Sequence, residues 1–89
     1  IIMLQIVENT LKEGKELEYI SVAKQFTNDL NQLESVESSK VYRNGNKVFI
    51  ITDWIYYDES REIELFLKYK SEMKPLFISN TELQLIEVL

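Results

Sequence analysis

The sequence predicts a ferredoxin-like α+β fold, in which two helices cover one face of a four-stranded antiparallel sheet. Three observations support this prediction. Asn44-Gly45 separates two stretches rich in β-branched and aromatic residues, which is typical of a β-hairpin. One amphipathic helical pattern precedes this hairpin and another follows it. A strand-like apolar stretch stands near each end of the chain, so we expect the order β-α-β-β-α-β within a single domain, residues 1–89.

The first part of the chain supplies one strand and one helix. Ile2 to Glu8 is rich in Ile, Leu and Val, and we expect a strand whose successive side chains point to opposite faces. Residues 9–14 are predicted to form a loop, in which Gly14 supplies a backbone conformation that few other residues tolerate. Residues 15–33 are predicted to form an amphipathic helix, because apolar side chains recur at three- and four-residue steps: Leu17, Ile20, Ala23, Phe26, Leu30 and Leu33.

The hairpin is predicted to join a strand at about residues 36–43 to a central strand at residues 47–56, with Asn44-Gly45 in the turn. The central strand is apolar on both faces, and such a strand must be covered on both. The chain's own helices can cover the face that carries Trp54. The other face is predicted to join two subunits into a homodimer, through Phe49, Ile51 and Ile55.

The last part of the chain supplies the second helix and the final strand. Asp58 or Ser60 is expected to cap the helix, because their side-chain oxygens can accept hydrogen bonds from its first free N–H groups. Pro75 fits poorly inside a helix, so we expect a bend or break within residues 71–75. Asn80-Thr81 is predicted to form a turn, and residues 82–89 the last strand.

Composition narrows the possible functions. The net charge of −5 argues against binding to nucleic acid or to an anionic membrane, and no apolar run has the length of a membrane span. The chain has no cysteine, which fits a cytoplasmic protein and excludes thiolate chemistry. It also has no histidine, which excludes a Ser-His-Asp triad and histidine ligation of heme or metal within this chain.

Several motifs, in this order and spacing, resemble the antibiotic biosynthesis monooxygenase family, part of the dimeric α+β barrel superfamily. The segment Asn9-Thr10-Leu11-Lys12-Glu13-Gly14-Lys15-Glu16 resembles the family's entry into its first helix. Val41-Tyr42-Arg43 precedes the hairpin, and the central strand closes with Trp54 before an acidic, helix-capping loop. The resemblance extends over essentially the whole chain. It implies a barrel made by the sheets of two subunits, with a pocket in each subunit between sheet and helices.

The resemblance also suggests residues for that pocket. Trp54 is a candidate for stacking on an aromatic ligand, and the alternative is that it fills the core. Asn9 could hold a substrate oxygen, or bond to local backbone as a turn residue. Tyr69, Phe66 and Met73 lie on the predicted second helix and could line the pocket or pack in the core. The glutamates of both helices are expected to be solvated, and no carboxylate pair stands out as a metal or acid–base site.

Three functions remain open. Some members of the family oxidise phenols or quinols with O2 and need no cofactor, which implies a cofactor-independent monooxygenase acting on a small aromatic molecule. The alternative is a non-catalytic homodimer that binds a small aromatic or apolar ligand. Other members degrade heme, but the histidine common after the tryptophan is missing from Ile63-Glu64-Leu65-Phe66-Leu67. Heme degradation is therefore the last of the three.

Overall fold

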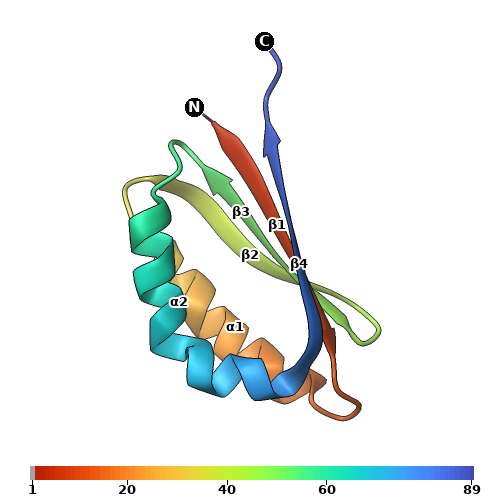
Figure 1. The fold of residues 1–89 in the computed structure, drawn as a ribbon. Helices are drawn as coiled ribbons and strands as arrows, with labels where there is room; N and C mark the ends of the chain where they lie inside the picture. Colours follow the sequence, from red (N-terminus) through yellow and green to blue (C-terminus); the bar gives the residue numbers. More distant parts are fainter. Residues whose placement is uncertain (1) are drawn as a thin grey trace.

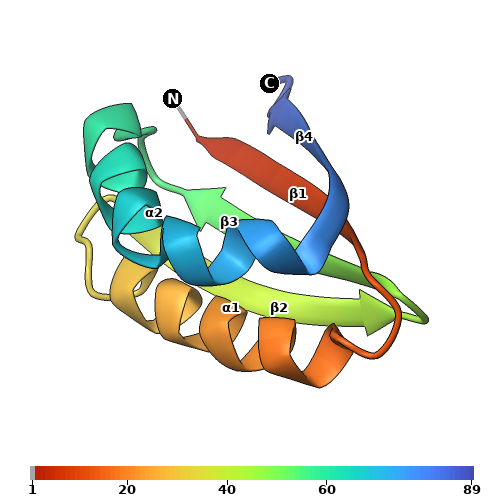
Figure 2. The ribbon, with the colours of Figure 1, turned by 60° about the horizontal axis from the view of Figure 1, so that its bottom comes forward.

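The computed structural model describes residues 2–89 and has the predicted order β-α-β-β-α-β. The four strands form one antiparallel sheet in the order β2-β3-β1-β4, and both helices pack on the same face of that sheet (Figures 1 and 2). The ferredoxin-like fold is confirmed. The elements are β1 (Met3–Leu11), α1 (Glu16–Leu30), β2 (Val36–Asn44), β3 (Lys47–Trp54), α2 (Glu59–Met73), a 3₁₀ turn (Lys74–Leu76) and β4 (Phe77–Ile86).

The pairing of the strands fixes which side chains face the helices. Val7 on β1 lies opposite Ile50 on β3 and opposite Glu82 on β4, so these three side chains share the helix face. Ile6 lies opposite Ile51, and this pair belongs to the outer face, which carries no helix. The alternation predicted for β1 and β3 is therefore confirmed, and the outer face is the one that carries Phe49 and Ile51.

The core lies between α1 and the middle of the sheet. Five apolar residues of this core are completely buried: Leu11, Ala23, Leu30, Val48 and Trp54. On α2 only Tyr69 and Met73 are buried, so this helix covers the sheet less completely than α1 does. Every residue of β4 after Phe77 is exposed, and β4 forms an edge of the sheet. This uneven cover leaves space between α2 and the β1–β4 side of the sheet.

The hairpin turn is one residue later than predicted. Asn44 pairs with Lys47, so Gly45 and Asn46 are the two central residues of the turn. Gly45 has a φ of +62°, and no residue other than glycine has a positive φ within residues 2–89. A positive φ at the first central position is the pattern of a type II′ turn. The prediction of a turn centred on Asn44-Gly45, which requires positive φ at both residues, was wrong.

The strand β1 continues through the segment predicted as a loop. Asn9, Thr10 and Leu11 all pair with β4, and the first two pair also with β3. Leu11 is completely buried, and its N–H donates to the carbonyl of Asn46 at 2.8 Å. Burial of this apolar side chain therefore extends the strand to the end of the hairpin, and the loop is limited to the residues around Gly14.

Two other elements end earlier than predicted. The helix α1 stops at Leu30 because the Asn31 side chain bonds to β2: its Nδ2 donates to the Ser39 carbonyl at 3.0 Å, and its Oδ1 accepts from the Ser39 N–H at 2.8 Å. The strand β3 stops at Trp54, beyond which the Ile55 N–H donates to the Ser35 carbonyl at 2.8 Å. Ile55 is exposed but lies past the end of the strand, outside the paired part of the outer face.

The last strand begins and ends earlier than the predicted residues 82–89, because β4 covers Phe77–Ile86. The helix α2 begins at the Asp58 cap, whose side chain accepts from the Arg61 N–H, and it ends at Met73 before the turn that contains Pro75. The predicted cap and break are confirmed. Asn80-Thr81 is not a turn, because both residues pair with β1 inside β4. Across residues 2–89, no helix is long and apolar enough to cross a membrane.

Candidate functional site

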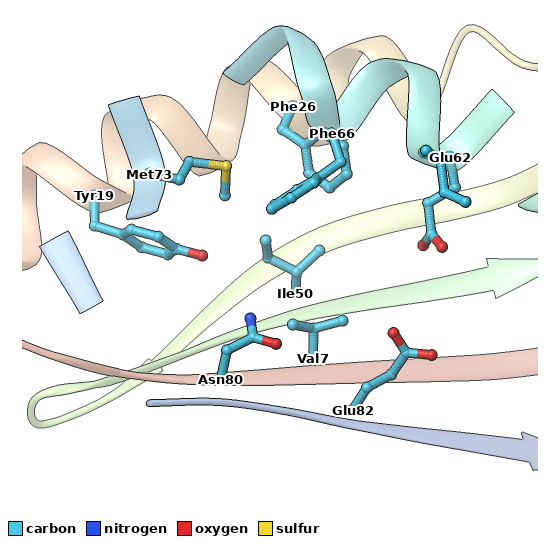
Figure 3. A pocket seen from close by; sticks show the side chains of 10 residues that line it. Val7, Tyr19, Phe26, Ile50, Glu62, Phe66, Met73, Asn80 and Glu82 are labelled. Atoms are coloured by element: carbon cyan, nitrogen blue, oxygen red, sulfur yellow. The ribbon is translucent and has the colours of Figure 1, made fainter. Parts of the chain in front are cut away.

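A pocket of about 240 Å³ lies between the sheet and the two helices (Figure 3). Its floor comes from three neighbouring strands of the sheet, and its roof from α1 and α2. The volume is below the roughly 300–1,000 Å³ typical of pockets for drug-sized ligands, so this pocket suits a smaller molecule. The lining residues are Val7, Tyr19, Phe26, Ile50, Glu62, Ile63, Phe66, Met73, Asn80 and Glu82.

Two carboxylates lie at one end of this pocket, Glu62 on α2 and Glu82 on β4 (Figure 3). The Tyr57 hydroxyl donates to Oε1 of Glu62 at 2.7 Å. Burial raises the pKa of Glu62, and the negative charges of Glu82 and Glu59 raise it further, while hydrogen bonding from Tyr57 and from the Gln5 amide opposes this rise. A carboxylate with a raised pKa holds a proton more strongly than an ordinary glutamate does, which suits a proton acceptor in an apolar pocket.

The Gln5 amide connects this end of the pocket to the core. Its Oε1 accepts a hydrogen bond from Nε1 of Trp54 at 3.0 Å. Its Nε2 is buried and has no hydrogen-bond partner of normal geometry, yet it lies near enough to the Glu62 carboxylate to lower the pKa of that group. The Trp54 ring also packs edge-on against Tyr57, with ring centroids 5.2 Å apart. Trp54 therefore contacts both side chains that lower the pKa of Glu62.

The opposite end of the pocket is formed by Tyr19 and Asn80 (Figure 3). Tyr19 is only 1% exposed, its hydroxyl points into the pocket, and burial raises the pKa of that hydroxyl, so it stays protonated at neutral pH. Nδ2 of Asn80 donates to Oδ1 of Asn9 at 2.6 Å. Nδ2 of Asn9 is buried without a partner, which is uncommon for an amide group inside a protein.

The structure separates the five residues suggested as pocket candidates. Phe66 and Met73 line the pocket. Trp54 and Asn9 are completely buried and do not line the pocket; Trp54 donates to Gln5, and Asn9 accepts from the pocket residue Asn80. Tyr69 lies in the seam between the helices, where its hydroxyl donates to Oδ2 of Asp29 at 2.5 Å and its ring packs against Phe26. This side chain does not line the pocket.

Sequence reasoning missed both polar ends of the pocket. Glu62 was expected to be solvated, but it lines the pocket and accepts a hydrogen bond from Tyr57. Asn80 and Glu82 were missed because we predicted a turn at Asn80-Thr81, where the structure has one continuous strand, β4. A signal was present: polar residues alternate at positions 80, 82 and 84, opposite Leu83 and Leu85. Such alternation fits a strand with one polar face over an open pocket.

The fold and the pocket define a class: a ferredoxin-like α+β protein with a small, mostly apolar pocket between sheet and helices. Among the described residues 2–89, no group of three or more Asp or Glu side chains is placed to hold a metal ion. No family model matches the chain, and no curated protein matches it.

Solved structures do match the fold. A "putative antibiotic biosynthesis monooxygenase" from Nitrosomonas europaea superposes with a TM-score of 0.86 at 8% identity, covering 94% of this chain and 88% of that one. Proteins with the same description from Chloroflexus aurantiacus and Bordetella bronchiseptica give TM-scores of 0.81 and 0.79, at 10% and 12% identity. Each covers 99% of this chain, which covers 94% and 98% of theirs. This chain therefore has the fold of antibiotic biosynthesis monooxygenase-like proteins.

Proposed function

We propose that this protein is a cofactor-independent monooxygenase that oxidises a small phenol or quinol with O2 in the pocket between sheet and helices. The observation that carries the proposal is the Glu62 carboxylate at one end of an otherwise mostly apolar pocket. The fold shared with proteins described as monooxygenases supports the same reaction class. The volume of about 240 Å³ favours a monocyclic or bicyclic substrate.

The proposed chemistry begins with proton transfer from the phenolic hydroxyl to Glu62. The resulting phenolate is electron-rich and gives one electron to O2, and the two radicals combine at a ring carbon ortho or para to the oxygen. The peroxide formed there takes back the proton from Glu62 and loses water, which leaves a quinone. One phenol and one O2 thus give one quinone and one water. The apolar walls, including Val7, Ile50 and Phe66, supply placement and desolvation.

The assembly proposed with this function is a homodimer joined through the outer face of the sheet. Leu4, Ile6, Phe49 and Ile51 are only partly buried on that face. Tyr42, Leu83 and Leu85 extend the same face and are between 44% and 53% exposed. A continuous apolar sheet face of this kind marks an interaction surface. Because the pocket lies on the opposite face, a sheet-to-sheet contact leaves each pocket within its own subunit.

Oxygen uptake by the purified protein tests the reaction. With a panel of phenols and reduced naphthoquinols, we expect uptake above the rate of autoxidation. Glu62→Gln keeps the side-chain shape but removes the proton acceptor, so the rate should fall by about 10²–10⁴-fold. Glu72→Gln, on the exposed side of the same helix, is the matched control and should retain the rate. Ligand binding without uptake across the panel would instead support a non-catalytic binding protein.

A further inference from the structure

The pocket presents different hydrogen-bonding groups at its two ends (Figure 3). Glu62 and Glu82 stand at one end, and an ionised carboxylate only accepts hydrogen bonds. Tyr19 and Asn80 are placed toward the other end, where a protonated hydroxyl and an amide NH₂ group can donate. Val7, between them on the floor, carries no polar side-chain atom.

The acceptor end is held in place from several elements. Oε1 of Glu62 accepts a hydrogen bond from the Tyr57 hydroxyl, and a carboxylate has about four acceptor positions, so the group can also accept a bond from a ligand. Glu82 lies opposite Val7 in the strand register, which places it beside the floor at the same end. Two carboxylates at one end repel an anionic ligand and favour a group that donates a hydrogen bond, such as a hydroxyl.

The donor end rests on a separate observation. Nδ2 of Asn9 is completely buried without a partner, and the neighbouring Asn80 amide is fixed by its 2.6 Å bond to Oδ1 of Asn9. The Tyr19 hydroxyl adds a donor that stays protonated. Two donors therefore line the pocket where the ligand's second end would lie, the Tyr19 hydroxyl and the second N–H of the Asn80 amide, and together they favour a carbonyl oxygen.

The spacing of the two ends follows from β4. Asn80 and Glu82 are two residues apart on one face of the strand, which corresponds to roughly 6.6 Å along it. The acceptor and donor side chains of β4 therefore stand at different positions along the pocket floor, as Figure 3 shows. The Phe66 side chain lies above the floor residues between the two ends, where it can pack on such a ring (Figure 3).

We propose that the pocket selects a neutral, flat aromatic ligand that carries a hydroxyl at one end and a carbonyl at the opposite end. The hydroxyl donates to Glu62, and the carbonyl accepts from Tyr19 and Asn80. The inference rests on the proposed function only in placing the substrate in this pocket, and it specifies which phenols are bound. Aromatic carboxylates are excluded by the charges of Glu62 and Glu82.

Binding under nitrogen tests the two ends independently of oxidation. The probes are 4-hydroxyacetophenone, 4-methoxyacetophenone, in which the hydroxyl is capped, and 4-ethylphenol, which lacks the carbonyl. Calorimetric titration of the unmodified protein should show about tenfold tighter binding of 4-hydroxyacetophenone than of either analogue, one hydrogen bond being lost in each. No binding of 4-hydroxyacetophenone, or equal affinity for all three probes, would overturn the proposal.

Substitutions at each end of the pocket test which residues cause the preference for the hydroxyl and which cause the preference for the carbonyl. Tyr19→Phe should abolish most of the preference for the carbonyl and leave the preference for the hydroxyl. Glu62→Met should do the reverse, and Glu72→Gln should change neither. Asn80→Ala, on the exposed edge strand, gives a second test of the donor end, and its melting temperature is measured as well because it also removes the hydrogen bond to Oδ1 of Asn9. Preferences that stay unchanged in Tyr19→Phe, Asn80→Ala and Glu62→Met, with melting temperatures showing folded protein, would overturn the assignment.

The outcome is separable from that of the oxidation assay. If the two preferences follow the variants as expected but no oxygen is consumed, the selectivity stands and the monooxygenase proposal fails. If oxygen is consumed and neither preference exists, the monooxygenase proposal stands and the two-ended selectivity fails.

Discussion

At the scale of single residues, the surroundings of Glu62 determine what the pocket can do. Burial and the charges of Glu82 and Glu59 disfavour the ionised carboxylate, whereas Tyr57 and Gln5 favour it. The net effect is a raised pKa. Because the pKa in the folded protein exceeds its unfolded value, the stability contributed by this group is fully present below the unfolded pKa and is lost as pH rises through the folded pKa. A group that costs stability when ionised is typical of a functional site.

The hydrogen bond from Tyr57 can be tested directly. In the unmodified protein, we expect the carboxyl carbon of Glu62 to titrate above the ordinary glutamate value of about 4.3, as followed by NMR with labelled glutamate. Tyr57→Phe removes a donor that stabilises the ionised form, so the midpoint should move to still higher pH.

The neighbouring tyrosine provides the control for this titration. Tyr56 is exposed, and Tyr56→Phe should leave the midpoint of Glu62 unchanged. A midpoint that moves to lower pH in Tyr57→Phe would show that the tyrosine does not stabilise the carboxylate. The proton-accepting role proposed for Glu62 would then need another source of support.

At the scale of helices and strands, the local sequence pattern predicted the type of each element and the direction of its side chains. It did not predict the residue at which each element ends. The alternation in β1 and β3 was readable, because each strand has a buried helix-facing side. The helical period of α1 was confirmed at Ala23, Phe26 and Leu30, but Leu17 of the same predicted stripe is exposed. The ends depend on distant contacts. The burial of Leu11 against the rest of the core extends β1, and the bonds between Asn31 and Ser39 stop α1. Neither contact can be derived from its own stretch of sequence.

The hairpin turn provides a prediction at this scale. Gly45 has a φ of +62°, and a Cβ added there would meet no atom within 4 Å, so the cost of a side chain is confined to the backbone. Gly45→Ala should lower the free energy of unfolding by about 1 kcal/mol, as measured by urea denaturation. Asn46→Ala, at the negative-φ position of the same turn, should change it much less. Equal losses in both variants would contradict the assignment of the turn to Gly45-Asn46.

At the scale of the whole molecule, the two faces of the sheet differ in what covers them. The helix face carries the core and the pocket, and the outer face carries an exposed apolar surface. The sequence indicated that both faces needed cover, but it did not show which face held the pocket. The position of the pocket depends on the pairing of β4 with β1, which brings Glu82 beside Val7 although the two residues lie near opposite ends of the sequence. The polar ends of the pocket are formed by this long-range strand pairing, and the pairing cannot be predicted from the local sequence pattern.

The outer face leads to the prediction of a homodimer. Ile51 lies near the centre of this face, opposite Ile6 on β1 and Lys40 on β2. At micromolar concentration, sedimentation should show a species of twice the 10.6 kDa mass of one chain. Ile51→Glu and Phe49→Glu should each shift the protein to the monomer, because either buries a charged carboxylate in an apolar interface.

The control for the dimer prediction is an equally drastic change away from the outer face. Leu67 on α2 is 58% exposed and does not line the pocket, so Leu67→Glu should leave the sedimentation of the dimer unchanged. A monomer in the unmodified protein would defeat the prediction, and so would a dimer that survives both charged substitutions. Because the pocket lies on the opposite face, Ile51→Glu should also retain the binding of 4-hydroxyacetophenone. Binding lost together with the dimer would show instead that the second subunit completes the site.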